Sequence, residues 1–321
     1  MLRFPVFFLS VLLVNTVFAG SQQSSYWLDK MMKAVHQLNY DGHFVYLHGD
    51  NIESLRTVHT VIDGHEIERL FSLNGEAREI VRDKDTVTRI MPNDKSVATT
   101  KRLMDTEYFS GFFVLQVEEI EKNYEINLSG RDRIADRATL VMVFKPRDDL
   151  RYGYRLNLDE EYALPLQWEM FDQQGSLISS IMFTQISIGD EVADSGSLLE
   201  KDNSPVTKHV TKQVTPSTQE LNNSPPKSAW HFDNIPNGFK LKHHRPTIPH
   251  HPKRDIEQYI FSDGIASFSV YIEQTDKSRL SGQAHLGALN AYGVFVDGHQ
   301  ITAVGEVPSE TLVFISNLAK K

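Results

Sequence analysis

Four histidines lie close together in the segment HHRPTIPHH, and they form the densest group of candidate metal ligands in the chain. They are His243, His244, His250 and His251. Imidazole nitrogens bind divalent metals when several side chains converge and further polar groups fix their tautomers. Prolines interrupt this segment, so an exposed, stiff loop is the alternative explanation. We favour the loop and predict no metal site.

A run of arginines is the second candidate, in a chain that is acidic as a whole. Guanidinium groups bind phosphates and carboxylates through paired hydrogen bonds. The run could contact such a ligand, or it could pair with acids on a solvated strand face, and the second explanation is the simpler one. The run consists of Arg131, Arg133, Arg137, Arg147, Arg151 and Arg155.

The common catalytic signatures are absent from the sequence. It contains no GxSxG, GxxxxGK[ST], GxGxxG or HExxH motif, and Arg69 stands where the pair His65-Glu66 would need a second histidine. It also contains no cysteine, so it offers neither a thiol nucleophile nor a thiolate ligand. We therefore predict that the protein is not an enzyme and has no cofactor.

Composition and the first residues indicate an exported protein. The 321 residues carry a formal net charge of −9, which disfavours a nucleic-acid partner. Residues 1–19 carry one basic residue, Arg3, followed by a short apolar run and then Ala19. This pattern is typical of a secretory signal peptide and is too short for a membrane span, so we predict cleavage after Ala19. A chain without cysteine fits a bacterial periplasm.

The segment from Ser24 to Asp83 predicts a helix followed by a strand meander. The pairs Asp63-Gly64 and Asn74-Gly75 are dipeptides that tight hairpins prefer. Behind the cap candidates Ser24 and Ser25, apolar residues recur at helical spacing. They are Leu28, Met31, Met32, Val35 and Leu38.

The pattern of the later strands predicts one buried, dry face and one solvent-exposed face. Tyr152, Tyr154, Leu156 and Leu158 alternate with polar residues or glycine, and the next strand repeats the pattern around Trp168. The stretch up to residue 188 therefore predicts one curved antiparallel sheet with helices on its concave side. An incompletely filled concave face is a natural apolar groove.

A polar segment rich in proline, serine and threonine separates this sheet from a second strand-containing module. Asp263-Gly264 and Asp297-Gly298 predict hairpins there, and a C-terminal helix should begin at Pro308 and Ser309 and extend to Leu318 or Ala319. We predict a signal peptide over 1–19, a large domain over 20–188, a linker over 189–228 and a smaller α+β domain over 229–321.

Particular strings resemble the MucB/RseB family of periplasmic regulators of the sigma-E envelope stress response. The main one is PRDDLRYGYRLNLDEEYALPLQW, from Pro146 to Trp168. Three further stretches are similar to that family: one that begins at Trp27, one from Tyr259 to Glu273 and one from Ile301 to Leu312. The resemblance implies an α+β fold, in which an unclosed antiparallel β-barrel with helices, like LolA and LolB, precedes the smaller domain.

The resemblance also implies a function. Members bind the periplasmic region of a transmembrane anti-sigma factor and shield it from regulated proteolysis, and a lipid or lipopolysaccharide signal relieves that protection. The alternative is a lipid or lipoprotein carrier of LolA type. Neither explanation needs a metal, a nucleic acid or a membrane-embedded chain, and both leave open whether the chain forms homo-oligomers.

Three sets of site residues follow from this hypothesis. For a lipid groove we expect Trp27, Met31, Phe44, Tyr46, Phe71, Phe112, Phe113, Tyr154 and Trp168, with Met31 filling the concave face rather than lining the groove. For contact with lipid head groups we expect Arg133, Arg137, Arg151 and Arg155. For the protein partner, edge strands of the smaller domain would accept an extended peptide, and we expect Phe261, Gly264, Phe268 and Tyr271.

Overall fold

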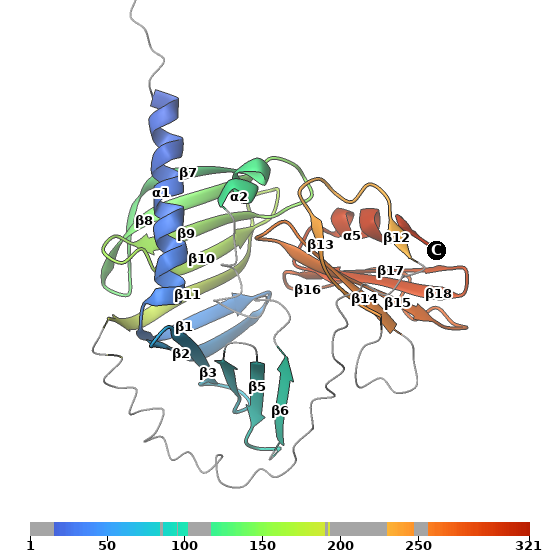
Figure 1. Cartoon of the computed structure of the whole chain (residues 1–321), viewed down its shortest axis with the longest axis horizontal. Coiled ribbons are helices and arrows are strands. Elements are labelled where there is room, and N and C mark those ends of the chain that lie inside the picture. The colour runs from blue at the N-terminus through green and yellow to red at the C-terminus, as the bar shows by residue number, and fades with distance from the viewer. Residues whose placement is uncertain are drawn as a thin grey trace, which may run out of the picture.

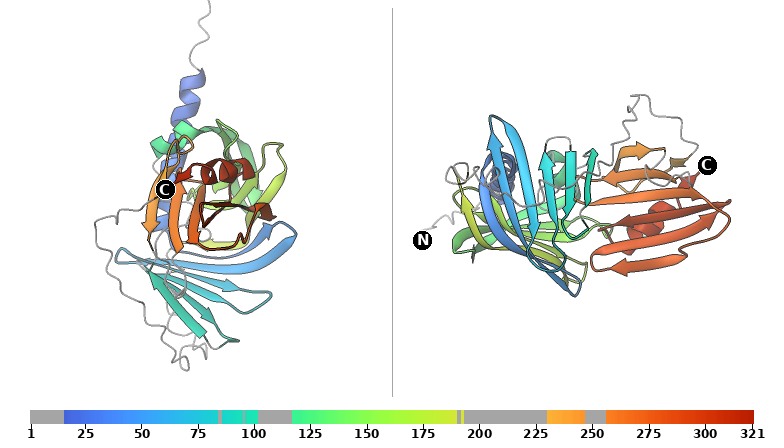
Figure 2. Two further views of the ribbon diagram at one scale, coloured as in Figure 1. Left: turned by 90° about the vertical axis from the view of Figure 1, so that its right-hand side faces the viewer. Right: turned by 90° about the horizontal axis from the view of Figure 1, so that it is seen from below.

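Two antiparallel sheets lie side by side in the computed structural model (Figures 1 and 2). The structure describes residues 16–83, 86–94, 96–101, 117–189, 192, 230–246 and 256–321. Most of the predicted linker, most of the predicted signal peptide, and Phe112, Phe113, His250 and His251 lie outside these residues. The domain boundaries drawn from the sequence therefore stay predictions.

The large sheet has eleven strands in the order β6-β5-β4-β3-β2-β1-β11-β10-β9-β8-β7, and its first and last strands do not pair with each other. This unclosed antiparallel barrel confirms the predicted fold class. Its strands are β1 (Tyr40–His48), β2 (Asn51–Ile62), β3 (His65–Ser72), β4 (Glu79–Asp83), β5 (Thr86–Met91), β6 (Ser96–Lys101), β7 (Tyr124–Ile134), β8 (Arg137–Pro146), β9 (Gly153–Asp159), β10 (Pro165–Phe171) and β11 (Leu177–Ile188).

Helix α1 (Thr16–Gln37) packs on the large sheet beside the short helix α2 (Val117–Asn123) (Figure 1). The side chains of Leu28, Met31 and Val35 are fully buried in the core of the large sheet, as the apolar stripe predicted. The expected start at Ser24 and Ser25 was wrong, because no proline interrupts residues 16–25 and the helix continues backward through them.

The small sheet has six strands in the order β13-β14-β15-β18-β17-β16. Helix α5 (Ser309–Ser316) covers one face of it, and Leu312 and Ile315 enter its core. The strands are β13 (Lys240–Arg245), β14 (Ile256–Ser262), β15 (Ser267–Gln274), β16 (Gly282–Leu286), β17 (Leu289–Val296) and β18 (His299–Gly305). The helix starts where the sequence predicted but ends earlier, because Ala319 pairs with Phe232 between β19 (Ala319–Lys320) and β12 (His231–Phe232).

Two of the three predicted Asp-Gly pairs form two-residue hairpins, whereas Asp263 and Gly264 begin a four-residue turn between β14 and β15. Asp63 and Gly64 join β2 to β3 with φ values of 51° and 76°, and Asp297 and Gly298 join β17 to β18 with 48° and 75°. Both central residues of such a turn need positive φ, which Gly adopts without strain and Asp tolerates. These turns fix the register of the strands that they join.

A buried ion pair fixes the small sheet against the large one. Arg151, two residues before β9, is fully buried, and its Nε donates to Oδ2 of Asp263 over 2.5 Å. The guanidinium also donates to Asp148 and to the carbonyl oxygen of Asn237, and it lies 4.6 Å from the ring centre of Phe239. Although burial opposes the charged form, the acidic partners raise the pKa of Arg151, so the guanidinium stays charged.

Neutral hydrogen bonds complete this inter-sheet junction. The side-chain amide of Asn290 donates to the hydroxyl of Tyr152 and to the carbonyl of Val307, each over 2.8 Å. The Thr311 hydroxyl on α5 donates to the carbonyl of Leu150 over 2.9 Å. Residues 150–152 therefore contact four separate parts of the chain around the small sheet: the turn before β15, the segment before β13, strand β17 and helix α5.

A second polar cluster joins α1 to strands β2 and β3. Glu66 Oε1 lies 3.0 Å from Nε2 of buried His59, and its Oε2 lies 3.3 Å from Nδ1 of His36. The His59 ring stacks on Tyr40, with 4.7 Å between ring centres. Burial alone would raise the pKa of Glu66, but both histidines outweigh it and lower the pKa to about 2.

Replacing Glu66 should change the acid dependence of stability. An ionised carboxylate with a lowered pKa stabilises the fold above its ordinary pKa of 4.5, and this contribution is lost as pH falls toward about 2. We expect Glu66→Gln to lower the free energy of unfolding by about 1–3 kcal/mol near neutral pH, with the difference shrinking below about pH 4. Urea denaturation across this range measures it. The exposed Glu76→Gln change is the control, and a difference that stays constant with pH would contradict the prediction.

Replacing Asp263 should weaken the junction. The isosteric change Asp263→Asn keeps an oxygen acceptor but removes the charge that faces buried Arg151, and we expect the free energy of unfolding to fall by about 3 kcal/mol. Lys240→Gln is the matched control, because it removes an ion pair between β13 and Glu119 on α2 in which Lys240 is 60% exposed. That control should cost less than about 1 kcal/mol. An equal fall in the free energy of unfolding in the two variants would contradict the prediction, because the buried pair would then stabilise the fold no more than the exposed one.

Candidate functional site

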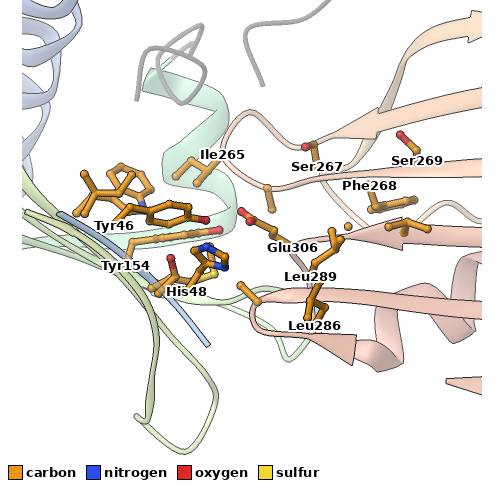
Figure 3. A pocket seen from close by; sticks show the side chains of 18 of the residues that line it. Tyr46, His48, Tyr154, Ile265, Ser267, Phe268, Ser269, Leu286, Leu289 and Glu306 are labelled. Carbon is orange, nitrogen blue, oxygen red and sulfur yellow. The ribbon is translucent and has the colours of Figure 1, made fainter. Parts of the chain in front are cut away.

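A cavity of about 530 Å³ lies between the two sheets, and we call it the inter-sheet cavity (Figure 3). Its wall on the large sheet comes from the inner face of strands β1, β9, β10 and β11 and from parts of β2 and β5. Its other wall comes from the turns and strand ends of the small sheet. The lining residues are Tyr46, His48, Glu53, Arg89, Tyr154, Trp168, Met170, Ser179, Ile181, Ile265, Ala266, Ser267, Phe268, Ser269, Leu286, Ala288, Leu289, Val304, Gly305 and Glu306.

Aromatic rings form the wall on the large sheet. The rings of Tyr154 and Trp168 lie 5.0 Å apart on adjacent strands, and Tyr46 stacks on His48 with 4.7 Å between ring centres. Strand alternation explains this wall, because every second residue of β9 and β10 points to the dry face that the sequence predicted. The surface offers broad apolar contact with a few hydroxyl and ring nitrogen groups.

The turn that carries Ile265 closes the cavity toward the junction. Oδ1 of Asp263 accepts hydrogen bonds from the backbone N–H of Ile265 over 2.9 Å and of Ala266 over 2.8 Å. Its other oxygen accepts from Arg151. One carboxylate therefore shapes the turn and attaches it to the large sheet, and Ile265 packs into the core of that sheet.

Leucines at the mouth of the cavity stay exposed. Leu286 is 69% exposed and Leu289 is 41% exposed, on either side of the turn between β16 and β17. In that turn Gly287 has a φ of 59°, and a Cβ built on it would lie 3.1 Å from the backbone nitrogen of Gly49. Gly49 lies in the turn between β1 and β2. That turn is so close to Gly287 that a side chain at Gly287 would require the backbone of Gly49 to move.

Glu306 places a carboxylate inside this apolar site, pointing toward His48 and Tyr154 in Figure 3. Burial raises the pKa of Glu306, and the charge of nearby His48 opposes the shift. Within the described part of the chain, its carboxylate has no hydrogen bond or ion pair. Glu53, the other acid in the lining, pairs with His48 and Arg78, so Glu306 is the acidic group of the cavity suited to a cation or a hydrogen-bond donor.

The predicted groove residues separate into three groups. Tyr46, Tyr154 and Trp168 line the inter-sheet cavity, although Tyr154 and Trp168 are also buried members of the large sheet's core, to which Met31 and Phe44 belong. Trp27 is partly buried against the core of the large sheet, and Phe71 is half-buried with its ring centre 4.9 Å from the guanidinium carbon of Arg69. Phe112 and Phe113 fall outside the described residues. Sequence reasoning missed the residues of the small sheet, because nothing in their local pattern indicates docking.

The four predicted head-group arginines contact acids of the chain. Arg133 pairs with Asp136, Arg137 with Asp159 over 2.5 Å, and Arg155 with Asp132 over 3.3 Å. For Arg151 the expected contact with a lipid head group was wrong, because its side chain is fully buried in the junction and cannot meet a ligand at the rim.

The predicted partner residues lie away from the sheet edges. Phe261 and Phe268 are buried and stack with 5.2 Å between ring centres, on strands β14 and β15 inside the small sheet. Tyr271 is also on β15, and Gly264 is in the turn before it. The edge strands are β13 and β16, and none of the four predicted residues lies on either of them.

Of the four histidines in the predicted segment, the structure describes His243 and His244. Among the described residues no group of three or more histidine, cysteine, aspartate or glutamate side chains could hold a metal ion. His244 lies 3.1 Å from a carboxylate oxygen of Glu257 and stacks on Tyr259. In the same part of the chain, no helix is long and apolar enough to cross a membrane.

Family models match both parts of the chain. The MucB/RseB N-terminal domain matches residues 23–205, and the MucB/RseB C-terminal domain matches residues 224–319. The chain belongs to the MucB/RseB family. This confirms the resemblance found in the sequence.

Curated relatives in the MucB/RseB family cover nearly the whole chain. The sigma-E factor regulatory protein RseB of Haemophilus influenzae is 26% identical over 97% of this chain and 95% of its own. The sigma factor AlgU regulatory protein MucB of Pseudomonas aeruginosa is 26% identical over 90% and 88%. The solved complex of MucA and MucB from Pseudomonas aeruginosa has a TM-score of 0.70 at 25% identity, covering 93% of this chain and 98% of the solved one.

Removing the charge of Glu306 should stabilise the protein. A carboxyl whose pKa is raised by folding stabilises the fold most when protonated, and this contribution is lost as pH rises through the raised pKa. We expect Glu306→Gln to raise the melting temperature by a few degrees near neutral pH, with no gain below about pH 4. Melting curves over pH measure this. The exposed Glu310→Gln change is the control, and a Glu306→Gln variant that is less stable at neutral pH would contradict the prediction.

Proposed function

We propose that this protein is a periplasmic regulator that represses the sigma-E envelope stress response. It binds the periplasmic region of a transmembrane anti-sigma factor, protects that region from regulated proteolysis, and loses this protection when a lipid or lipopolysaccharide signal binds. The observation that carries the proposal is the likeness to MucB solved together with MucA, across both sheets and over 98% of the solved chain. Relatives named as sigma factor regulatory proteins support the same role.

The exposed edge β16 is our candidate for the partner site. Within the described residues, β16 pairs only with β17, and most of its residues are exposed. An open edge accepts an extended peptide by forming main-chain hydrogen bonds, while neighbouring side chains supply specificity. Leu286 and Leu289 would provide the apolar contacts.

The inter-sheet cavity is our candidate for the lipid site. Tyr46, Tyr154, Trp168 and Ile181 offer an apolar surface to an acyl chain, and Arg89 brings a cationic group to the same cavity. A ligand there touches both sheets. Because Leu286 on the edge strand β16 and Leu289 beside it on β17 also line the cavity, filling one site changes the other, and the two affinities are linked.

Titration of the partner tests the proposal. The periplasmic segment of the anti-sigma factor should bind the full chain saturably, and Leu286→Asp should weaken binding about tenfold, because a charge replaces an apolar contact. Lipopolysaccharide fragments should also lower the affinity for the segment. Isothermal titration calorimetry, with and without the fragments, measures both effects.

Phe314→Asp is the matched control, because Phe314 is an apolar residue on α5 that is 43% exposed and does not line the cavity. It should leave partner affinity unchanged. Full affinity in Leu286→Asp would remove β16 from the proposal, and an affinity insensitive to the fragments would remove the lipid coupling. Isolation with many lipoproteins rather than one membrane protein would favour the carrier alternative.

A further inference from the structure

A second hollow, of about 460 Å³, lies on the face of the small sheet opposite α5. The helix packs on core residues such as Val270 and Ile301, and their neighbours along each strand point to the other face. This hollow is separate from the inter-sheet cavity and shares no residue with it. Its lining residues are Arg245, Ile256, Gln258, Tyr271, Glu273, Gln300 and Thr302.

Four of these residues form one straight row across four strands, which we call the polar row. Arg245 on β13 is paired in register with Gln258 on β14, and Gln258 is paired with Tyr271 on β15. Tyr271 is in turn paired with Thr302 on β18. Directly paired residues of antiparallel strands present their side chains to the same face, so the row lines one side of the hollow.

Hydrogen bonds orient the polar row so that it presents donors. Nη1 of Arg245 donates to Oε1 of Gln258 over 3.2 Å, and Nε2 of Gln258 donates to the hydroxyl oxygen of Tyr271 over 3.0 Å. Because the tyrosine oxygen accepts this bond, its own hydrogen points elsewhere. The guanidinium keeps four further N–H groups, and the Thr302 hydroxyl adds another donor.

The charge of Arg245 is unbalanced within the described residues. Its guanidinium is partly buried, yet no carboxylate in the described chain lies within ion-pairing distance, and burial lowers its pKa. The one acid in the hollow, Glu273, lies 3.4 Å from Arg279 instead. A partly desolvated guanidinium without an acid favours an incoming anion.

We propose that the polar row of Arg245, Gln258, Tyr271 and Thr302 binds a single oxyanion, the phosphate or carboxylate group of a small ligand. The guanidinium of Arg245 supplies the charge and donates to the oxyanion, and the hydroxyls of Tyr271 and Thr302 donate to its remaining oxygens. Gln258 positions the row and has no direct contact with the ligand. This site is independent of the regulator role proposed above.

Titration of the full chain with inorganic phosphate, and separately with succinate, tests the site. Nuclear magnetic resonance shifts or calorimetry should give saturable binding below about 10 mM for at least one anion. We expect Arg245→Gln to weaken it about tenfold and Tyr271→Phe several-fold, because each removes a donor and only the first removes charge. Arg131→Gln is the matched control, since it deletes a 78% exposed guanidinium on the other sheet and should change nothing.

The two anions distinguish the source of the oxyanion. Saturation by phosphate alone assigns a phosphate group, saturation by succinate alone assigns a carboxylate, and saturation by both assigns a general oxyanion site. No saturable binding of either anion would overturn the proposal, as would unchanged binding in Arg245→Gln. If Arg245→Gln lowers the melting temperature too far to titrate, Tyr271→Phe decides, because it leaves the charge in place, and unchanged binding in that variant overturns the proposal.

Discussion

The structure depends on one buried carboxylate that faces two ways. Asp263 accepts two backbone N–H bonds that shape its own turn, and it accepts the guanidinium of Arg151 from the large sheet. An ion pair removed from water stabilises only when its remaining hydrogen-bonding groups are also satisfied, and here Asp148 and the Asn237 carbonyl complete that set. Each wall of the inter-sheet cavity is placed relative to the other through this contact.

The location of the cavity follows from that contact. A sheet of eleven strands that does not close leaves its concave face unfilled, and α1 covers only part of it. The small sheet covers another part with turns and strand ends rather than with a flat face (Figure 3). Turns pack less completely than a sheet face does, so a cavity remains where the aromatic residues of β9 and β10 meet them.

Local patterns predicted much of the fold but little of the site. Alternation in β9 and β10 identified the dry face that carries Tyr154 and Trp168, and Asp63-Gly64 and Asp297-Gly298 identified two hairpins. The partner of Arg151 lies 112 residues away in the sequence, and no spacing rule connects the two. The same limit explains why Arg151 was expected at a rim and why Phe261 and Phe268 were expected at an edge. No local sequence pattern around Glu306 or Leu286 indicates that either residue lines a cavity.

The contact between Gly49 and Gly287 restricts how this family member can change over generations. Both residues have positive φ, and a Cβ on either would approach the backbone of the other to 3.2 Å or less. A side chain at either position is strained by the positive φ and needs the facing backbone to move, and the facing residue, already a glycine, has no side chain to lose. Each glycine is therefore required independently of the other, and the turn between β16 and β17 can diversify its exposed side chains only around a fixed glycine.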